Sequence, residues 1–234
     1  MSAQPTETPT YPADVGATPF LLTVRGKPVP TSTDEARTTH NGTAGAPPSV
    51  AGARSLGDLS HNVYTGLADS TGEILFIDIW NSIEGLGQFF ADPQVQQAAG
   101  LLFAEREGVV WRPTSGFGDV HLPLPSGKSA QSVGILRATV SSLDKAAAAF
   151  NAYSAETLNR GRAHGLVSHA VWLRVADPGE DPSTEVLGVD IWSDTARMNE
   201  FYDLGIGYDH LGPVFAGQPA TSIWESAPGN WEEW

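Results

Sequence analysis

A repeated segment constrains the fold of this chain more than any other feature of its sequence. Residues 77–82 (IDIWNS) recur as residues 189–194 (VDIWSD), so that Asp78 and Asp190 lie 112 positions apart. A self-similar period of this length indicates one structural unit of about 100 residues used twice. The same offset continues without a gap through Phe89/Phe201, Phe90/Tyr202, Gly100/Gly212, Phe103/Phe215 and Ala104/Ala216.

Both copies predict the same order of elements. In the second copy, alternating β-rich runs predict strands at 134–142, 166–176, 185–192 and 221–225, and helix formers predict helices at 144–164 and 194–215. The first copy predicts strands at 20–25, 61–67, 73–80 and 108–112, with its first helix broken at 42–48 by Gly and Pro. The order β-α-β-β-α-β is that of the split-βαβ, ferredoxin-like unit, which predicts an α+β fold.

These limits divide the chain into four parts. We expect a disordered tail over residues 1–14, a first unit over 15–112, a Pro-, Gly- and Ser-rich linker over 113–132, and a second unit over 133–234. The two long parts are called unit 1 and unit 2 below.

Composition excludes several classes of function. The formal net charge is −14, with 13 basic residues scattered along the chain, so neither nucleic acid nor an anionic membrane is an expected partner. The absence of cysteine excludes disulfides, thiolate nucleophiles and cysteine-ligated metals. The N-terminal residues lack the basic and apolar regions of a signal peptide, and no apolar run reaches about 20 residues, which favours a cytoplasmic protein.

The segment from Asp78 to Glu84, with Phe89, Phe90 and the Asp92-Pro93 step, resembles the antibiotic-biosynthesis-monooxygenase (ABM) type of dimeric α+β barrel. The second copy keeps Asp190, Trp192 and Phe201 without the Asp-Pro step. The resemblance implies two ferredoxin-like units whose sheets form a barrel, here within one chain. It also implies functions ranging from cofactor-independent oxygenases to haem proteins, lyases and isomerases, so the fold does not fix the reaction.

A histidine, an acid and a tryptophan are expected on one sheet face in each copy. In strand 73–80, Leu75, Ile77 and Ile79 form an apolar face that we place against the helices, while Phe76, Asp78 and Trp80 share the other. A tight hairpin would set His61 opposite Trp80, and the second copy repeats this with His169, Asp190 and Trp192.

Two interpretations of this set stay open. In one, His61 and His169 are general bases oriented by Asp78 and Asp190, and the tryptophans and Phe76 wall a flat substrate. In the other, each His–Asp pair is a buried structural hydrogen bond that the copies share by descent.

His40 and Asn41 lie beside the Gly/Pro break and align with Phe150 and Asn151 of the second copy. We predict His40 as a further catalytic residue and Asn41 as a substrate-binding residue, the alternative being a helix end at Asn41-Gly42. His210 aligns with Ala98, and we consider it as an axial haem ligand, with an exposed turn as the alternative. A metal set of His40, His61 and Asp78 has no diagnostic spacing, and no metal is predicted.

The residues and the resemblance together predict a small-molecule enzyme that uses no cofactor. A His/Asp pair would abstract a proton from a small apolar or aromatic substrate in a barrel or sheet–helix pocket. Such an enzyme would be a monooxygenase if the carbanion reacts with dioxygen, or a lyase or isomerase if only a proton is moved. The alternatives are a haem-dependent enzyme with His210 or His169 as ligand, and a non-catalytic ligand-binding barrel. The expected free sheet edges favour a homo-oligomer. We expect the aromatic residues Trp231 and Trp234 to contact a partner subunit or to cover the mouth of a pocket.

Overall fold

The computed structural model describes residues 19–121 and 132–234, so that the tail expected over 1–14 lies outside the described residues. Unit 1 contains β1 (Phe20–Pro28), α1 (Thr33–Gly42), α2 (Pro47–Ser55), β2 (Asp58–Leu67), the 3-10 helix η1 (Ala68–Ser70), β3 (Ile74–Trp80), α3 (Ile83–Ala91), α4 (Pro93–Leu102) and β4 (Phe103–Pro113). After the short β5 (Val120–His121), unit 2 contains β6 (Ser132–Thr139), α5 (Leu143–Ala163), β7 (Leu166–Arg174), β8 (Glu185–Trp192), α6 (Thr195–Asp203), α7 (Tyr208–Leu211), the 3-10 helix η2 (Gly212–Val214) and β9 (Ala220–Ser226).

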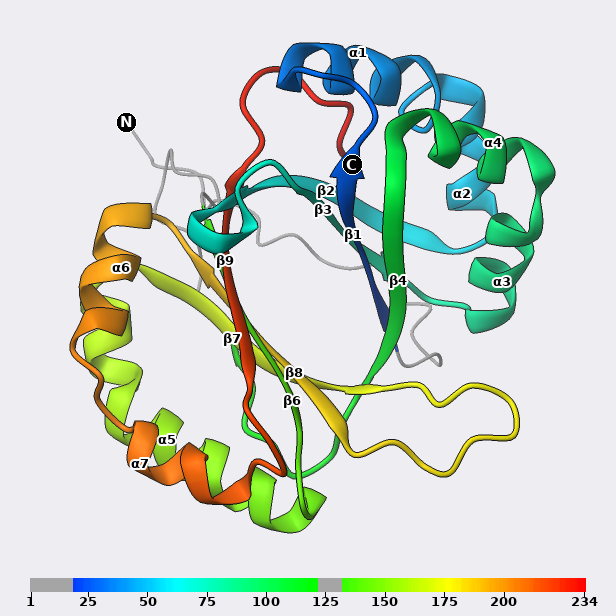
Figure 1. The fold of residues 1–234 in the computed structure, drawn as a ribbon. Coiled ribbons are helices and arrows are strands. Elements are labelled where there is room, and N and C mark those ends of the chain that lie inside the picture. The colour runs from blue at the N-terminus through cyan, green and yellow to red at the C-terminus, as the bar shows by residue number, and fades with distance from the viewer. Residues whose placement is uncertain (1–18, 122–131) are drawn as a thin grey trace, which may run out of the picture.

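Eight antiparallel strands close into a ring. The strand order is β4-β1-β3-β2 in unit 1 and β9-β6-β8-β7 in unit 2, and the pairs β2–β9 and β4–β7 join the two sheets. Helices α1–α4 and α5–α7 lie on opposite outer sides of this barrel (Figure 1). Every strand of the described ring is therefore paired on both sides, so the free sheet edges on which we based a homo-oligomer are absent there, and the oligomer stays a prediction.

The hairpins bring each histidine directly opposite its acid. His61 pairs with Asp78 and His169 with Asp190, whereas the expected register set His61 opposite Trp80. The observed pairing register differs from the expected one by two residues. The expected register assumed a tight turn at residues 70–72, but β2 already ends before η1, so the hairpin turns earlier in the chain. A shift of two keeps every side chain on its face, so the predicted grouping of His, Asp and Trp on one face is correct.

The expected assignment of the two faces is wrong. Leu75, Ile77 and Ile79 point into the barrel, and Phe76, Asp78 and Trp80 point toward the helices. Both faces of these strands are buried, so the apolar pattern alone does not tell them apart. The interior of an eight-stranded barrel is just wide enough to be filled by side chains. Here it holds Leu21, Tyr64, Leu75, Ile77, Trp111, Val133, Leu187, Val189 and Trp224.

The helices begin where the sequence predicts. Ser32, Ser142 and Asp194 cap α1, α5 and α6 by accepting a hydrogen bond from a backbone N–H of the first turn. The Gly/Pro segment divides the first helix of unit 1 into α1 and α2, with Pro47 at the first position of α2. The expected helix over 194–215 is also divided, because Gly205 and Gly207 adopt positive φ angles between α6 and α7.

The repeat extends into the segments that follow β4 and β9. Asn151 Nδ2 donates to the carbonyl of Gly116 at 2.8 Å, and Asn151 Oδ1 accepts from the N–H of Gly118 at 2.7 Å. Asn41 does the same with Asn230 and Glu232, at 2.8 and 3.0 Å. Residues 116–120 and 230–234 are thus equivalent, and the first part of the expected linker is an ordered element of the fold.

Each of these segments then pairs with the histidine-bearing strand of the other unit: 116–120 follows β4 and reaches β7, and 230–234 follows β9 and reaches β2. The N–H of His61 donates to the carbonyl of Trp234 at 2.7 Å, and Val120 pairs with His169 in the same way. Trp234 therefore occupies in unit 1 the place that Val120 occupies in unit 2.

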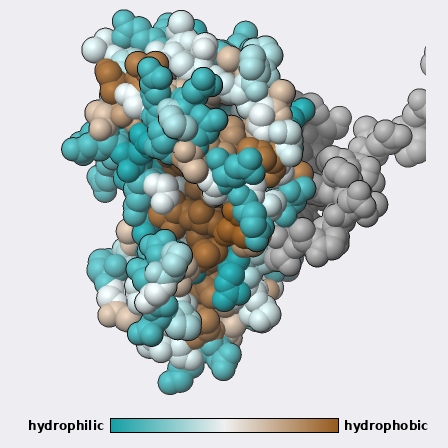
Figure 2. All heavy atoms as spheres, turned by 90° about the vertical axis from the view of Figure 1, so that its right-hand side faces the viewer, coloured by the Kyte–Doolittle hydropathy of each residue, from teal (hydrophilic) through white to brown (hydrophobic). Residues whose placement is uncertain are grey.

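One outer face of the molecule carries an apolar area. Figure 2 shows hydrophobic residues gathered across the middle of the face that carries β4 and the β7–β8 loop, with polar residues above and below them. Among the described residues, no helix combines the length and the apolar character that a bilayer crossing demands.

Candidate active site

In unit 2, Asp190 holds two side chains with its two carboxylate oxygens. The Nδ1 of His169 donates to Oδ1 at 2.5 Å, and the hydroxyl of Tyr202 donates to Oδ2 at 2.8 Å. Strand β8 supplies the acid, β7 the histidine directly opposite, and α6 the tyrosine. The Nε1 of Trp192 donates to the Tyr202 oxygen at 3.3 Å. Trp192 is completely buried, and this hydrogen bond holds the Tyr202 hydroxyl in place.

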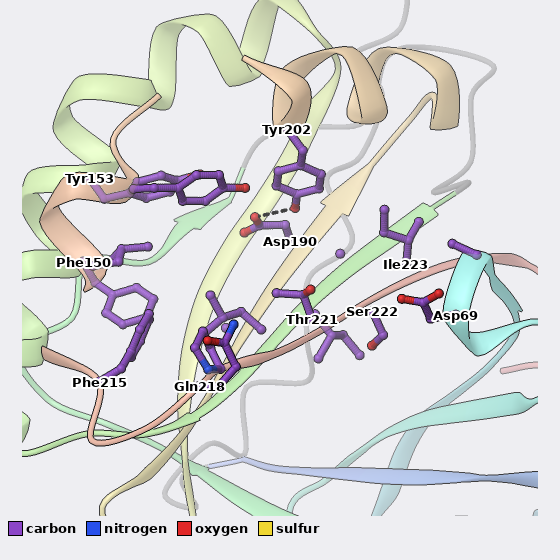
Figure 3. Close-up of a pocket in the computed structure, with 18 of the residues that line it drawn as sticks. Asp69, Phe150, Tyr153, Asp190, Tyr202, Phe215, Gln218, Thr221, Ser222 and Ile223 are labelled. Carbon is purple, nitrogen blue, oxygen red and sulfur yellow. Dashed lines mark hydrogen bonds between the residues drawn. The ribbon is translucent and has the colours of Figure 1, made fainter. Parts of the chain in front are cut away.

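Beside this group lies a pocket of about 580 Å³ between the sheet of unit 2 and its helices. Figure 3 shows Tyr202 and Asp190 joined on one side, Phe150 and Phe215 together on another, and Asp69 across the opening. Tyr153 stacks on Tyr208 with their ring planes 10° apart. The unit 1 segment Leu67–Ser70 contributes to the rim, so both units form the site. This apolar, concave space with a few convergent polar groups is typical of a small-molecule site.

Burial and the acid set the ionisation of the groups in the pocket. Burial alone would lower the pKa of His169, but the charge of Asp190 and the hydrogen bond to it outweigh burial and raise it. Burial, together with the Asp190 charge, raises the pKa of Tyr202 well above its usual value. At neutral pH these directions favour an imidazolium at His169 and a neutral phenol at Tyr202. None of the described residues that line the pocket is a lysine or an arginine.

Unit 1 repeats the His–Asp pair but seals it. The Nδ1 of His61 donates to Asp78 Oδ1 at 2.7 Å, and the Nε2 atoms of His61 and His40 face each other at 3.0 Å. The side chain of Asp78 is 7% exposed against 17% for Asp190. Trp234 stacks on His61 with ring centroids 4.6 Å apart, and Trp231 lies 5.2 Å from His40. The aromatic C-terminal residues therefore cover the first copy, where the side chain of His61 is buried.

The structure places the other predicted residues outside the pocket. Asn41 holds residues 230 and 232, and Trp80 is a buried core residue whose Nε1 has no hydrogen-bond partner. Phe76 is buried between His40, His61 and Phe103. The Nε2 of His210 pairs with Glu156 at 2.8 Å near the surface, and His210 does not line the pocket. Of the predicted residues, only His169 and Asp190 line the open pocket.

Tyr202 is a polar pocket residue that the sequence analysis did not single out. It aligns with Phe90, so the added hydroxyl was visible as a difference between the copies. Its contact with Asp190 depends on Gly134, because a Cβ there would lie 2.2 Å from the Tyr202 oxygen. The equivalent of Gly134 in unit 1 is Leu22, which pairs with Asp78 as Gly134 pairs with Asp190.

The residues present do not fit haem, the cofactor that the family resemblance implies as an alternative. The Nε2 of His169 has no partner, as an axial ligand requires, but it is buried without accessible surface. The lining also lacks cations to pair with the haem propionates. Within the described residues, no group of three or more His, Asp or Glu side chains could hold a metal ion, so the set of His40, His61 and Asp78 does not form one.

These elements define the class of fold: a tandem dimeric α+β barrel of two ferredoxin-like units, of the type shared by ABM-like monooxygenases and chlorite dismutases. An anthrone oxidase-like protein superposes with a TM-score of 0.64 and 13% identity, over 91% of this chain and 94% of the other. A candidate monooxygenase from Fusobacterium nucleatum gives 0.60 and 9%, over 91% and 94%.

A chlorite dismutase from Candidatus Nitrospira defluvii gives a TM-score of 0.50 and 8% identity, over 89% of this chain and 92% of the other. No protein-family model matches the sequence, and no curated protein sequence matches it. At these identities the similarity establishes the fold, and the reaction must be inferred from the site.

Proposed function

We propose that this protein is a cofactor-independent enzyme that removes a proton from a small, uncharged aromatic substrate in the pocket of unit 2. The observation that carries the proposal is the placement of Asp190: a partly exposed carboxylate, held by His169 and Tyr202, at the wall of an otherwise apolar pocket. The carboxylate lies within hydrogen-bond distance of a phenol that lines the pocket, which is the geometry that a proton relay needs.

The geometry supports a short relay. The Tyr202 oxygen accepts a proton from the substrate while the Tyr202 hydroxyl proton passes over 2.8 Å to Asp190 Oδ2. The imidazolium of His169 stays bonded to Oδ1 and balances the carboxylate charge before the transfer. His169 then orients Asp190 and is not itself the base, which differs from the role that we predicted for it.

The anion left on the substrate determines the class of reaction. If dioxygen is the second substrate, a CH₂ group becomes a carbonyl: one oxygen atom enters the product, the other leaves as water, and the substrate supplies all four electrons. If no oxygen reacts, return of the proton at another carbon makes the protein an isomerase. The overall likeness to an anthrone oxidase-like protein and to candidate monooxygenases supports the oxygenase.

The residues that line the pocket restrict the class of substrate. Its acids are Asp69 and Asp190, and it offers no lysine or arginine to a carboxylate group. Its lining includes the aromatic side chains of Phe150, Tyr153, Tyr202, Tyr208 and Phe215. Aromatic side chains bind flat rings through stacked or edge-on contacts. We therefore expect neutral phenols and ring-bearing ketones to bind, and the corresponding carboxylic acids to bind at least tenfold more weakly.

Proton removal can be tested apart from oxygen chemistry. Ring-bearing ketones and phenols are incubated with the protein in D₂O without oxygen, and deuterium uptake at the acidic carbon is followed by NMR. We expect faster uptake than in buffer, and oxygen consumption when air is admitted. The absence of both across such a panel would contradict the proposal, and uptake without oxygen consumption would favour the isomerase.

A further inference from the structure

The two copies differ most where the pocket is open. On β8, Gly188 lies two residues before Asp190 on the same face, and its equivalent before Asp78 is Phe76. A Cβ added to Gly188 would meet only ordinary contacts, at 3.7 Å from Phe150 and 3.8 Å from Leu136. Tight packing therefore does not require glycine at this strand position.

In unit 1 the phenyl ring of Phe76 fills the corresponding space. Its centroid lies 4.8 Å from that of His61, 5.4 Å from that of His40 and 5.3 Å from that of Phe103. All three contacts are edge-on, with ring planes 61° to 71° apart. This is the preferred geometry of an aromatic ring among others.

The equivalents of these three neighbours surround the corresponding space in unit 2. By the repeat, His61 corresponds to His169, His40 to Phe150 and Phe103 to Phe215, and all three of these unit 2 residues line the pocket. Figure 3 shows Phe150 and Phe215 side by side at one end of the pocket. Unit 2 thus keeps the surroundings of the Phe76 ring without the ring itself.

We propose that Gly188 creates a subsite for a six-membered aromatic ring, which the ligand places where unit 1 places the ring of Phe76. This inference rests on the proposed function for the identity of the ligand, but not for the existence of the subsite. The ring lies over the Gly188 backbone, edge-on to His169, Phe150 and Phe215. Because Gly188 and Asp190 are two residues apart, about 7 Å along a strand, a ring substituent points toward Asp190 and Tyr202.

The test uses 2-naphthol, a neutral two-ring phenol, as the probe. Its affinity is measured by calorimetry, and the histidine ring protons are followed by NMR during the titration. We expect the His169 signal to shift through the ring current of the probe, while the signal of the sealed His61 stays in place. Binding that leaves His169 unmoved would overturn the subsite.

A substitution tests the role of Gly188 directly. G188F supplies the ring that unit 1 carries, and we expect it to weaken 2-naphthol binding at least tenfold and to abolish the His169 shift. G188L fills the space with a smaller side chain and serves if G188F does not fold. The matched control is G108F, at an exposed strand glycine with no neighbour within 4 Å of its Cβ position, and it should bind like the wild type.

Failure of the subsite is distinguishable from failure of the proposed function. Wild-type affinity in both G188F and G188L would refute the subsite, whatever the protein catalyses. Loss of binding in these variants, together with an absence of deuterium uptake in every ketone and phenol tried, would leave the subsite standing and refute the reaction.

Discussion

The Nε2 atoms of His40 and His61 face each other at 3.0 Å in the sealed copy, and this contact fixes the protonation of both rings. The Nδ1 of His61 donates to Asp78, and the Nδ1 of His40 donates to Asn41 Oδ1 at 2.9 Å, an oxygen that also accepts from Glu232. If both rings were neutral, each Nε2 would carry a lone pair, and the two lone pairs would face each other. One of the two Nε2 atoms must therefore carry a proton, and the carboxylate of Asp78 beside His61 favours an imidazolium there that donates to a neutral His40.

The pKa directions agree with this assignment. Burial, and then the charge of His61, lowers the pKa of His40 from 6.5 to about 4. Burial would lower the pKa of His61 as well, but Asp78 outweighs it and raises the pKa. The cluster is thus an ion pair with a neutral histidine attached to it, a stabilising arrangement in unit 1.

Replacing His40 by Phe, the residue of unit 2, should change the pH dependence of stability. The folded state resists protonation of His40, so the wild type loses stability as pH falls from 6.5 to about 4. H40F lacks this loss. At pH 7 it should be less stable by about 1–3 kcal/mol, because the Nε2–H of His61 loses its acceptor.

Urea unfolding of H40F and wild type at several pH values between 4 and 7 measures the effect. The stability difference between the two proteins should shrink toward pH 4. A difference that is constant across this range would show that His40 does not titrate as assigned.

The ionised side chain of Asp58 should lower the free energy of unfolding at neutral and alkaline pH. It is 5% exposed, and its Oδ1 has no hydrogen-bond partner. Burial, and then the charge of Asp78, raises its pKa from 3.8 to about 7. The folded protein binds a proton that the unfolded chain releases in this range, so stability falls as pH rises from about 4 to 7.

The variant D58N should therefore be more stable than the wild type at pH 8, by the order of 2–4 kcal/mol, and nearly equal to it at pH 4. Thermal unfolding at both pH values measures this, with D181N in the exposed β7–β8 loop as the control. A destabilised D58N at pH 8 would show that the contacts of the charged carboxylate with His61, Trp234 and the Ser60 backbone outweigh its burial.

Much of the fold follows from the sequence because the repeat has a constant offset. It predicts two ferredoxin-like units and nearly every element, and the strand alternation correctly groups His61 with Asp78 and His169 with Asp190. The direction of each face was not predictable, because strands buried on both sides carry apolar residues on both. Asn41 was assigned to the substrate because its true partners, 230 and 232, lie about 190 residues away in the chain.

The site was predicted only in part, for a related reason. The residues that the copies share include a sealed His–Asp pair as well as an open one, and the differing histidines, His40 and His210, do not line the pocket. The open pocket depends on residues that differ: Gly134 for Leu22, Gly188 for Phe76 and Tyr202 for Phe90. Two of these three are glycines, which carry no chemistry and leave no motif.

Gly134 should act as a positioning residue for Tyr202. In G134A the new methyl group takes the place of the Tyr202 hydroxyl and moves it away from Asp190. We expect kcat to fall by about 10–100-fold with little change in KM, as in Y202F, because one proton-transfer step is impaired.

The double variant separates this role from a general packing defect. Adding G134A to Y202F should reduce kcat by less than about threefold, since the hydroxyl is already gone and the two changes act on one contact. Losses in kcat that multiply, as two independent changes would give, would mean that Gly134 does not act through the Tyr202 hydroxyl.

Hemin should not form a stable complex with this protein. The buried Nε2 of His169 and the absence of lining cations predict no retained Soret band after hemin is added and the sample is desalted. A retained band that H169A abolishes and H210A does not would contradict this and establish His169 as the ligand.

The most direct test of the central claim compares the two acids of the repeat. D190N and D78N make the same change in equivalent strands, one at the open pocket and one in the sealed copy. With a substrate identified by deuterium uptake, and rates corrected for the folded fraction, D190N should lose at least 100-fold in kcat and D78N less than threefold. Equal losses, or a larger loss in D78N, would show that the open pocket of unit 2 is not the active site.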